Sequence, residues 1–578
     1  MARHDPHSYT DDAQPRADTL TWRAHVDFPT RALSCEATLR FAETAQAGPL
    51  DLDTRALVVE SVVDEHGTEL EFELGRTEPI LGQRLRVAVP RAASAISLRY
   101  RTSPEATALQ WLDPSQTSGG RQPFLYTQCQ PIHARSVVPL QDTPTTRLRF
   151  DASIDAPPEL TVLMAAEALA DGSFRMQQPI APYLFAFAIG DLVSRDLGPR
   201  TRVWAEPSMV EDAAWEFAET EQMLSTGEQL FGPYDWGRYD VLVLPPAFPY
   251  GGMENPRLTF LTPSVVVGDR SSVAVIAHEL AHSWTGNLIS NANAEHFWLN
   301  EGGATYAERR IVEALWGSDT AQLDWALGRQ QLDEAMQRLE SEGRPQLTCL
   351  RTHLDGIDPD DAYTQVPYEK GALLFRALEQ AAGRAAFDTF LRAYIDRFRF
   401  RAITTEEFVA FLQAQSPRPG LDPAPWLYEP GLPVNAPRAA SSRLDAIRAL
   451  HGRLPSDDLA NAWTATEWQL YIDSVPAPAA IGTLEELDTR YDLTATRNYD
   501  VVERWLVLGI RSGYGPAVAR AQEVLGSIGR MKYLRPLYSA LADRQETRAL
   551  AQELFERYAP RYHPIARQVV AGILLRRQ

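Results

Sequence analysis

The sequence predicts a multidomain α+β protein with an N-terminal antiparallel β domain, a mixed α/β domain and a C-terminal α-helical domain. Three observations support this prediction. The chain has 578 residues, which is too long for a single hydrophobic core. Apolar residues alternate with period two in the first third of the chain and follow a helical period in the last quarter. A stretch rich in Pro, Gly and small residues separates the middle of the chain from its helical end.

The β domain is predicted over residues 19–190. Alternation of polar and apolar residues is typical of half-buried strands in antiparallel sheets. The clearest alternating segments are 20–28, 84–90, 96–101 and 146–155. Residues 1–18 are polar and contain no apolar run, so they predict a flexible N-terminal arm and not a signal peptide.

The mixed domain is predicted over residues 191–430. A short strand, 239–245, precedes the glycine-rich turn YGGMENP, and a helix over 271–284 follows and ends before Gly286. Residues 431–442 form the predicted linker. The remaining residues, 443–578, show helical periodicity with short breaks, which indicates a stack of helical hairpins without a fixed repeat length.

The overall composition excludes several classes of protein. A formal net charge of −20 argues against nucleic acid or an anionic membrane as the main partner. The sequence contains no run of 18 apolar residues, so we expect no membrane-spanning helix. The three cysteines are far apart and form no CxxC pair, which suits a reducing compartment. We therefore expect a cytoplasmic protein.

The segment AHELAHSWTGN, residues 277–287, predicts two metal ligands. On a helix, residues four apart project from the same face, so His278 and His282 can take adjacent corners of a tetrahedral zinc ion. Glu279 is about 100° further around the helix, where it can take a proton from a zinc-bound water. The alternative is a helix with two structural histidines, and a third ligand decides between these interpretations.

The third ligand is predicted in HFWLNEGGATYAERR, residues 296–310. Glu301 lies nineteen residues after His282, in the first turn of a helix that we expect to begin near Asn300. Glu308 is seven residues further on and faces the same side, where it can accept a hydrogen bond from a zinc-binding histidine. Two histidines, one carboxylate and an open fourth position are typical of a catalytic zinc site, with one ion per chain.

These motifs together resemble a known family. HELAH, eighteen intervening residues and NEG, preceded by GGMENP, are similar to the zinc aminopeptidases of the gluzincin type. The segments YTQCQPIHARS, YGGMENPRLTF, VPYEKG and GRMKYLRPL resemble the branch of leukotriene A-4 hydrolase and aminopeptidase B. The likeness covers nearly the whole chain. It implies a thermolysin-like catalytic domain and an armadillo- or HEAT-like helical domain.

The resemblance also implies a set of residues that hold the substrate's free amine. Glu254 would anchor the amine, helped by Gln130 and Gln128. Gly251 and Gly252 allow the backbone to approach a substrate closely, and Met253 stands between them and Glu254. Without the zinc motif nearby, the same stretch would be a simple tight turn.

Other positions are assigned by the same likeness. Tyr368 would stabilise the oxyanion, with Glu369 and Lys370 expected to form a local ion pair behind it. Tyr363 and Asp360 match positions that line the substrate channel, although neighbouring acidic residues also allow a solvated loop. Arg530 and Lys532 match a pair that binds the substrate's carboxylate. A tryptophan of leukotriene A-4 hydrolase is replaced by Ala294, which should widen or reshape the side-chain pocket.

The sequence therefore predicts a monomeric zinc aminopeptidase that removes the N-terminal residue from short peptides. One alternative is an epoxide hydrolase or a bifunctional enzyme like leukotriene A-4 hydrolase, which would need a long apolar tunnel. Another is a non-catalytic peptide-binding scaffold on the same fold. Such a scaffold should have lost Glu279 or a zinc ligand, and this chain retains all of them.

Overall fold

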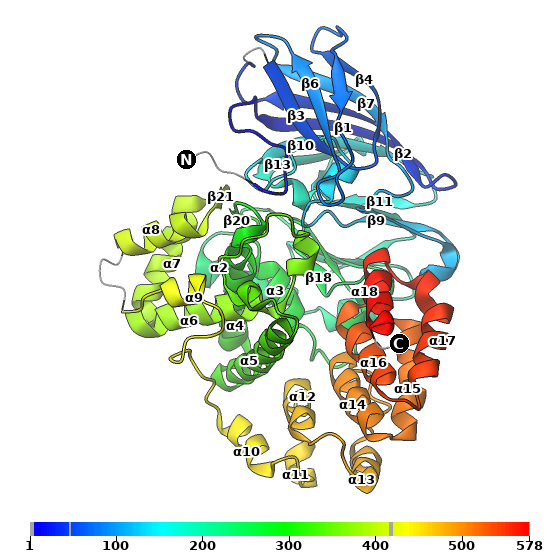
Figure 1. The fold of residues 1–578 in the computed structure, drawn as a ribbon, viewed down its shortest axis with the longest axis vertical. Helices are drawn as coiled ribbons and strands as arrows, with labels where there is room; N and C mark the ends of the chain where they lie inside the picture. The colour runs from blue at the N-terminus through cyan, green and yellow to red at the C-terminus, as the bar shows by residue number, and fades with distance from the viewer. Residues whose placement is uncertain (1–4, 46–47, 416–419, 577–578) are drawn as a thin grey trace.

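The computed structural model describes residues 5–45, 48–415 and 420–576. Figure 1 shows three domains in the predicted order, with the β domain in blue, the catalytic domain mainly in green and the C-terminal helices in orange and red. The predicted fold class is confirmed.

The first domain is built on a seven-stranded sheet. Strand β1 pairs in parallel with β10, and the other pairings are antiparallel. Residues of β1 alternate between buried and more exposed, as the period-two pattern predicted. In spatial order, the strands are β12 (Glu167–Ala168), β13 (Phe174–Ile180), β10 (Leu148–Asp155), β1 (Ala17–Asp27), β2 (Ala32–Phe41), β7 (Ala95–Arg101) and β4 (Val58–Asp64).

Two smaller sheets complete this domain. One sheet has the order β3 (Gly48–Thr54), β6 (Gln83–Val89) and β5 (Phe72–Leu74). The other has the order β11 (Thr161–Met164), β14 (Phe187–Gly190), β9 (Phe124–Thr127) and β8 (Leu109–Leu112). Figure 1 shows β9 and β11 on the side of the β domain that faces the other two domains.

The N-terminal segment differs from its prediction. Residues 1–4 of the predicted flexible arm lie outside the described residues. Residues 5–16 pack against the folded surface, because His7 is only 1% exposed and the Ser8 hydroxyl donates to Asp53. The polar composition predicted a flexible arm. A sequence does not distinguish polar residues that form hydrogen bonds with distant residues from polar residues that are exposed to solvent.

The catalytic domain begins with a five-stranded mixed sheet, in which β18 is an edge strand. Its order is β15 (Val193–Asp196), β16 (Thr201–Ala205), β17 (Tyr239–Val243), β19 (Leu258–Leu261) and β18 (Gly252–Met253). A two-stranded sheet joins β20 (Ile289–Asn291) to β21 (Arg401–Ile403). The helices of this domain are α1 (Val210–Glu216), α2 (Thr220–Phe231), α3 (Ala274–Ala281), α4 (Trp298–Trp316), α5 (Ser318–Ser341), α6 (Gly371–Ala382), α7 (Arg384–Phe398), α8 (Thr405–Gln415) and α9 (Ala424–Tyr428).

The C-terminal domain is helical, and its core is separate from that of the other two domains. Leu323 and Ala326 of α5 belong to this second core, so one helix of the catalytic domain packs into both. The helices are α10 (Ser442–Leu450), α11 (Asp457–Ala460), α12 (Ala465–Ser474), α13 (Ile481–Tyr491), α14 (Tyr499–Ser512), α15 (Gly515–Ser527), α16 (Met531–Asp543), α17 (Arg548–Tyr558) and α18 (Pro564–Leu575).

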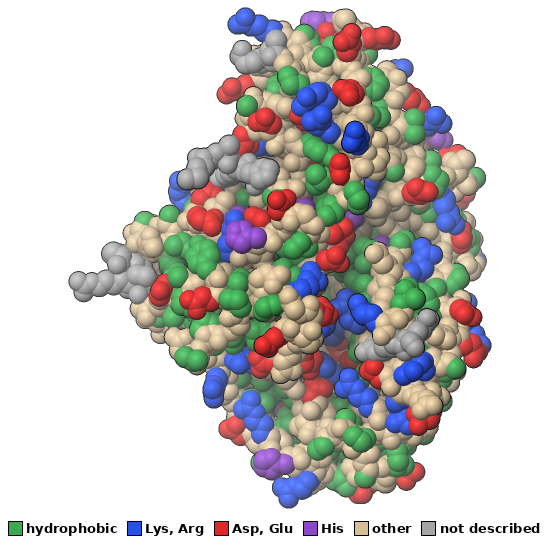
Figure 2. Space-filling view, viewed as in Figure 1, with side chains coloured by type: hydrophobic (Ala, Val, Ile, Leu, Met, Phe, Trp, Pro, Cys, Tyr) green, Lys and Arg blue, Asp and Glu red, His purple; other side chains and the backbone are tan. Residues whose placement is uncertain are grey.

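The surface is hollowed where the catalytic and C-terminal domains meet. Figure 2 shows acidic and basic side chains gathered around this hollow. Among the helices of the described residues, none combines the length and apolar character needed to cross a membrane.

Candidate active site

The two predicted zinc ligands on α3 lie side by side. The Nε2 atoms of His278 and His282 are 3.2 Å apart. Helix α3 is shorter than predicted, but His282 caps it with helical backbone angles (φ −56°, ψ −22°) and so keeps its place on the same face. Gly286, just beyond, has a φ of +128°, and an added Cβ would lie 2.6 Å from His282 Nδ1. A glycine is therefore required where the chain turns behind the histidine.

Glu301 completes a cluster of three potential ligands. It lies in the first turn of α4, with Oε2 at 3.3 Å from His278 Nε2 and 3.5 Å from His282 Nε2. Its Oε2 atom is buried and meets hydrogen-bond geometry with no described residue. These three residues are one of two groups among the described residues that could hold a metal ion; the other is Glu254, Glu279 and His282.

The outer nitrogens of the histidines show that a cation fits this cluster. His278 Nδ1 lies 3.1 Å from Glu308 Oε2, and His282 Nδ1 lies 3.2 Å from the carbonyl oxygen of Thr285. Both partners only accept hydrogen bonds, so both Nδ1 atoms carry a proton. The Nε2 atoms of both rings face the Glu301 oxygen and are the nitrogens available to a metal. Three electron-pair donors converging in a buried site are the donor set of a catalytic zinc.

Glu279 lies beside this cluster. Burial raises its pKa to about 7, although His278 and His282 act in the opposite direction. Its carboxylate packs against the glycine turn, since a Cβ added to Gly252 would lie 2.3 Å from Glu279 Oε1. Any larger residue at position 252 would therefore displace the glutamate.

Glu254 follows β18 and lies on the same side of the cleft. It is 3% exposed, and its Oε1 accepts a hydrogen bond of 3.1 Å from Gln130 Nε2. Ligand atoms of Glu254, Glu279 and His282 all lie within 4.8 Å of one another. Asn287 Nδ2 donates to the Glu254 carbonyl at 2.7 Å, which joins this segment to the end of the histidine motif.

The other residues of the predicted amine site adjoin Glu254. Gln128 Nε2 lies 3.3 Å from Met253 Sδ, while Gln128 Oε1 is buried with no partner among the described residues. Met253 is 2% exposed. Gly251 faces Arg530, because an added Cβ would meet the Arg530 guanidinium at 2.6 Å.

Tyr368 lies in a π-helical turn, η8 (Val366–Lys370), and reaches the metal cluster. Its ring stacks on His278 at a centroid distance of 6.0 Å. Burial and the nearby Glu301 carboxylate raise the pKa of its hydroxyl, so it stays a donor at neutral pH. π-helical turns often occur at functional sites because they redirect one side chain.

The predicted ion pair between Glu369 and Lys370 is wrong. Glu369 accepts a hydrogen bond of 2.8 Å from Arg309 of α4, and Lys370 Nζ donates to the carbonyls of Thr348 and Glu429. Glu369 and Lys370 are adjacent in this turn but point to opposite sides, so each one contacts a residue far away in sequence and not its neighbour.

Asp360 lies in a short 3₁₀ turn, η7 (Pro359–Ala362), at the edge of the cleft. Its Oδ2 accepts a hydrogen bond of 2.9 Å from His133 Nε2, and His133 Nδ1 contacts the Thr107 hydroxyl. Asp360 Oδ1 is buried without a partner among the described residues. Tyr363 follows in sequence and packs edge-to-face on Phe297 at 4.7 Å.

Arg530 and Lys532 enter the cleft from the C-terminal domain. The Arg530 guanidinium donates to the hydroxyls of Ser264 and Tyr533, and Lys532 Nζ lies 2.6 Å from Asp500 Oδ1. Burial alone would raise the pKa of Asp500, but Lys532 and Arg530 lower it to about 2. Arg530 thus faces the glycine turn, while Lys532 is paired within its own domain.

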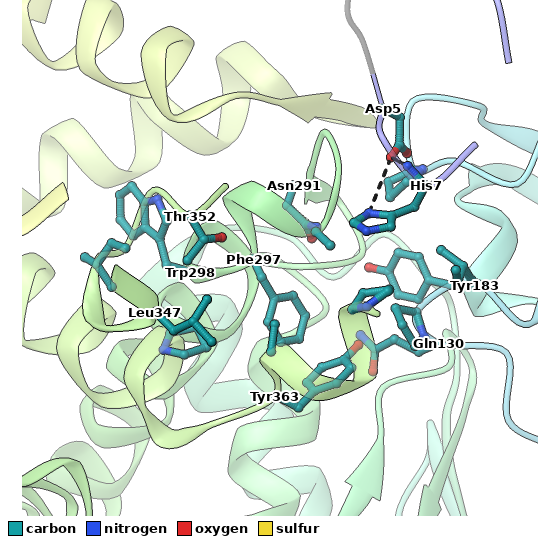
Figure 3. Close-up of a pocket in the computed structure, with 18 of the residues that line it drawn as sticks. Asp5, His7, Gln130, Tyr183, Asn291, Phe297, Trp298, Leu347, Thr352 and Tyr363 are labelled. Carbon is teal, nitrogen blue, oxygen red and sulfur yellow. Dashed lines mark hydrogen bonds and ion pairs between the residues drawn. The ribbon is translucent and has the colours of Figure 1, made fainter. Parts of the chain in front are cut away.

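A pocket extends from the cleft, and Figure 3 shows its lining. Most of its lining is apolar. Gln130, Tyr183 and His7 lie on one side of it, and Leu347 and Trp298 on the other. Ala294 lines it, as expected for a residue that shapes a side-chain pocket.

Sequence reasoning missed several residues that hold the site together. His133 lies in the segment YTQCQPIHARS, and Asn287 lies at the end of AHELAHSWTGN. Their position next to predicted site residues was the signal that could have identified them. Arg309 gave no such signal, since its partner Glu369 is sixty residues away in sequence.

Family comparisons match all three domains. The model of the peptidase M1 N-terminal domain matches residues 6–172, and that of the peptidase family M1 domain matches residues 215–421. The model of the leukotriene A4 hydrolase C-terminal domain matches residues 463–574.

Individual relatives extend over the full chain. Leukotriene A-4 hydrolase of Xenopus laevis is 36% identical, covering 98% of both chains. Leucine aminopeptidase 2 of Yarrowia lipolytica is also 36% identical, covering 99% of this chain and 95% of the relative. Among solved structures, the yeast hydrolase in complex with bestatin superimposes with a TM-score of 0.92 at 31% identity, covering 99% of this chain and 97% of that one. The M1 zinc metallopeptidase of Deinococcus radiodurans shares the fold, with a TM-score of 0.60 at 21% identity, covering 76% of this chain and all of its own.

Proposed function

We propose that this chain, which belongs to peptidase family M1 and within it to the branch of leukotriene A4 hydrolase and leucine aminopeptidase 2, removes the N-terminal residue from short peptides. The observation that carries this proposal is the position of Glu254. Its carboxylate lies within 4.8 Å of ligand atoms of Glu279 and His282, directly beside the metal cluster. A buried carboxylate there can accept hydrogen bonds from the free amine of a peptide and hold it at a fixed distance from the metal cluster.

The proposed mechanism assigns one task to each group. His278, His282 and Glu301 would hold one zinc ion per chain, which supplies Lewis acidity that polarises a carbonyl and makes water a stronger acid. Glu279 takes a proton from the attacking water and returns it to the leaving amine. Its carboxylate lies beside the proposed ligands, within reach of a water bound there.

The remaining groups position the substrate. Glu254 accepts hydrogen bonds from the free amine, and Gln130 orients the Glu254 carboxylate through their 3.1 Å contact. Tyr368 donates to the oxygen of the former carbonyl, where negative charge develops. The edge strand β18 leaves backbone groups of Gly252 and Met253 available to an extended peptide.

Metal removal together with a blocked substrate tests this proposal. Purified enzyme should hydrolyse alanyl, leucyl or arginyl anilides, lose this activity with a chelator, and regain it with one equivalent of zinc. The matched control is the N-acetylated leucyl anilide, which lacks the free amine and should not be cleaved. Equal cleavage of blocked and free substrates would contradict the role of Glu254.

Epoxide hydrolysis is a second candidate function, and the apolar pocket is the observation that favours it. This reaction would also need a long apolar tunnel beside Asp360. Asp360 would place a second water in that reaction. A comparison of an epoxide fatty acid with the anilide panel separates the two activities. A non-catalytic scaffold is disfavoured because the chain retains Glu279 and all three ligands. The monomeric state and cytoplasmic location stay predictions.

A further inference from the structure

The N-terminal segment, residues 5–16, is anchored on the β domain by buried charged groups. Arg135 is fully buried and donates a hydrogen bond of 2.7 Å to the carbonyl oxygen of His7. Asp53 is also fully buried and accepts a hydrogen bond of 2.6 Å from the Ser8 hydroxyl. Buried charged groups are costly to leave without partners, so these contacts fix the position of the segment.

The same arginine belongs to the segment YTQCQPIHARS, which contributes to the cleft. Arg135 lies two residues after His133 and five after Gln130, the residue that donates to Glu254. Figure 3 shows His7 on the same side of the pocket as Gln130. The N-terminal segment therefore shares its anchor with a residue of the proposed amine site.

The ring of His7 reaches the catalytic domain. Its Nε2 atom lies 2.9 Å from the carbonyl oxygen of Ile357, and a carbonyl only accepts, so Nε2 carries the ring proton and donates it. Ile357 belongs to residues 355–363, which we call the channel loop. Among the described residues, this loop forms one other hydrogen bond with a distant part of the chain, the 2.9 Å contact between His133 Nε2 and Asp360.

These contacts form a closed circuit across the two domains. Arg135 binds the backbone of His7, and the His7 ring binds Ile357. The channel loop then leads to Asp360, which binds His133, two residues before Arg135. Two links thus hold the channel loop against the segment that carries Gln130. With either link alone, the loop could pivot about the remaining hydrogen bond.

We propose that residues 5–16 are a strap between the β domain and the catalytic domain, and that His7 is a positioning residue that holds the channel loop, with Asp360 and Tyr363, beside the cleft. The effect on peptide hydrolysis rests on the proposed function. Tyr363 lines the pocket at the cleft, but the loop carries none of the groups assigned to bond cleavage. Loss of the His7 link should therefore raise KM more than it lowers kcat.

Two variants of His7 that differ in reach test this role. The amide nitrogen of a glutamine can take the place of histidine Nε2, whereas asparagine is one methylene shorter and does not reach Ile357. His7→Asn should raise KM for a leucyl anilide by about fivefold or more with kcat within about twofold of wild type, and His7→Gln should restore most of the affinity. The matched control is His66→Asn, an exposed histidine of the β domain, which should change neither constant. Zinc content and thermal unfolding verify the fold of each variant.

Hydrogen exchange measures the channel loop directly and needs no activity. The backbone amides of Ile357 and Asp361 are hydrogen-bonded to nearby carbonyls. Both should exchange faster in His7→Asn than in the wild type, while the amides of α3 and α4 keep their rates. In His7→Gln the loop should exchange like that of the wild type.

The second link provides a further test. His133→Phe keeps an aromatic ring but removes the contact with Asp360. In the double variant with His7→Asn, KM should rise by more than the product of the two single effects, because each link compensates for the loss of the other.

Three outcomes would overturn the positioning role. These are unchanged KM and loop exchange in His7→Asn, equal effects of His7→Asn and His7→Gln, and a double variant whose single effects simply multiply. Absence of anilide hydrolysis by the wild-type enzyme would instead overturn the proposed function. Hydrogen exchange would then still decide whether His7 holds the channel loop.

Discussion

The partners of the two histidines explain at the level of single residues why this cluster suits a metal. Glu308 and the carbonyl of Thr285 accept the protons of the outer nitrogens, so the inner nitrogens, 3.2 Å apart, are the ones that face Glu301. Although burial opposes it, the nearby carboxylates raise the pKa of both rings, so the cluster favours positive charge at this point. Spacing in the sequence placed the two rings on one face, but only their outer contacts determine which nitrogen is free to bind.

Glu279 offers the sharpest test at this scale. Glu279→Gln keeps the shape of the side chain but cannot accept a proton, so kcat should fall by about 10²–10⁴-fold while zinc content stays unchanged. Steady-state kinetics and elemental analysis check both results. The control is Glu340→Gln, an exposed glutamate of α5, which should behave as wild type. Near-normal kcat in Glu279→Gln would contradict the proposed mechanism.

The π-helical turn η8 positions Tyr368 through contacts on both of its sides. Glu369 reaches Arg309 of α4, the helix that also carries Glu301, and Lys370 reaches the carbonyls of Thr348 and Glu429. Gly328 of α5 leaves room for this turn, since an added Cβ would lie 2.2 Å from Glu369 Oε2. The tyrosine is thus fixed to the same helix as a metal ligand.

The buried ion pair of Arg309 and Glu369 predicts that a single variant is less stable than the double variant. Arg309→Met leaves the Glu369 carboxylate buried without its partner, which should lower the free energy of unfolding by about 3–5 kcal/mol. The double variant Arg309→Met/Glu369→Leu removes both charges and should recover most of that loss. Chemical denaturation followed by tryptophan fluorescence gives the unfolding midpoints, and the midpoint of the double variant should lie above that of Arg309→Met.

The matched control for this comparison is Arg329→Met. Its pair with Asp333 lies on a partly exposed face of α5, with side chains 37% and 42% exposed. Removing such a pair should cost less than about 1 kcal/mol. A double variant no more stable than Arg309→Met would show that the pair does not account for the loss.

The cleft requires all three domains at the scale of the whole molecule. The β domain contributes Gln130, the catalytic domain the metal cluster, and the C-terminal domain Arg530. The loop before α16 docks by backbone hydrogen bonds, from Gly529 to the Pro246 carbonyl and from Met531 to the Pro249 carbonyl. These contacts place Arg530 against the glycine turn.

The position of Arg530 predicts that kcat/KM depends on a free carboxylate at the C-terminal end of the substrate. Arg530→Met should lower kcat/KM for a tripeptide with a free carboxylate by about tenfold or more, because it removes a charge-assisted contact. The same tripeptide with a C-terminal amide should be affected much less. The control is Arg520→Met on α15, where Arg520 is partly exposed and pairs with Glu523. Equal losses for both peptides would mean that Arg530 acts only by docking the domains.

The sequence by itself predicted the order of the domains, the candidate metal ligands and the proposed amine-binding turn. Local periodicity predicts the order of the domains. The metal ligands are predictable because two of them are four residues apart and the third lies in the first turn of the following helix. The amine-binding turn is predictable from the motif GGMENP. These features depend on residues close together in the chain, where spacing fixes direction.

Only the tertiary structure decided what lies around them. The partner of Glu369, the support of Asp360 by His133 and the contact of His7 with the Ile357 carbonyl all join residues far apart in sequence. Buried polar groups must find partners, but composition does not say which, because many distant pairings would satisfy the same donor or acceptor. Folding selects one of them, and that selection gave the N-terminal segment its place in the pocket.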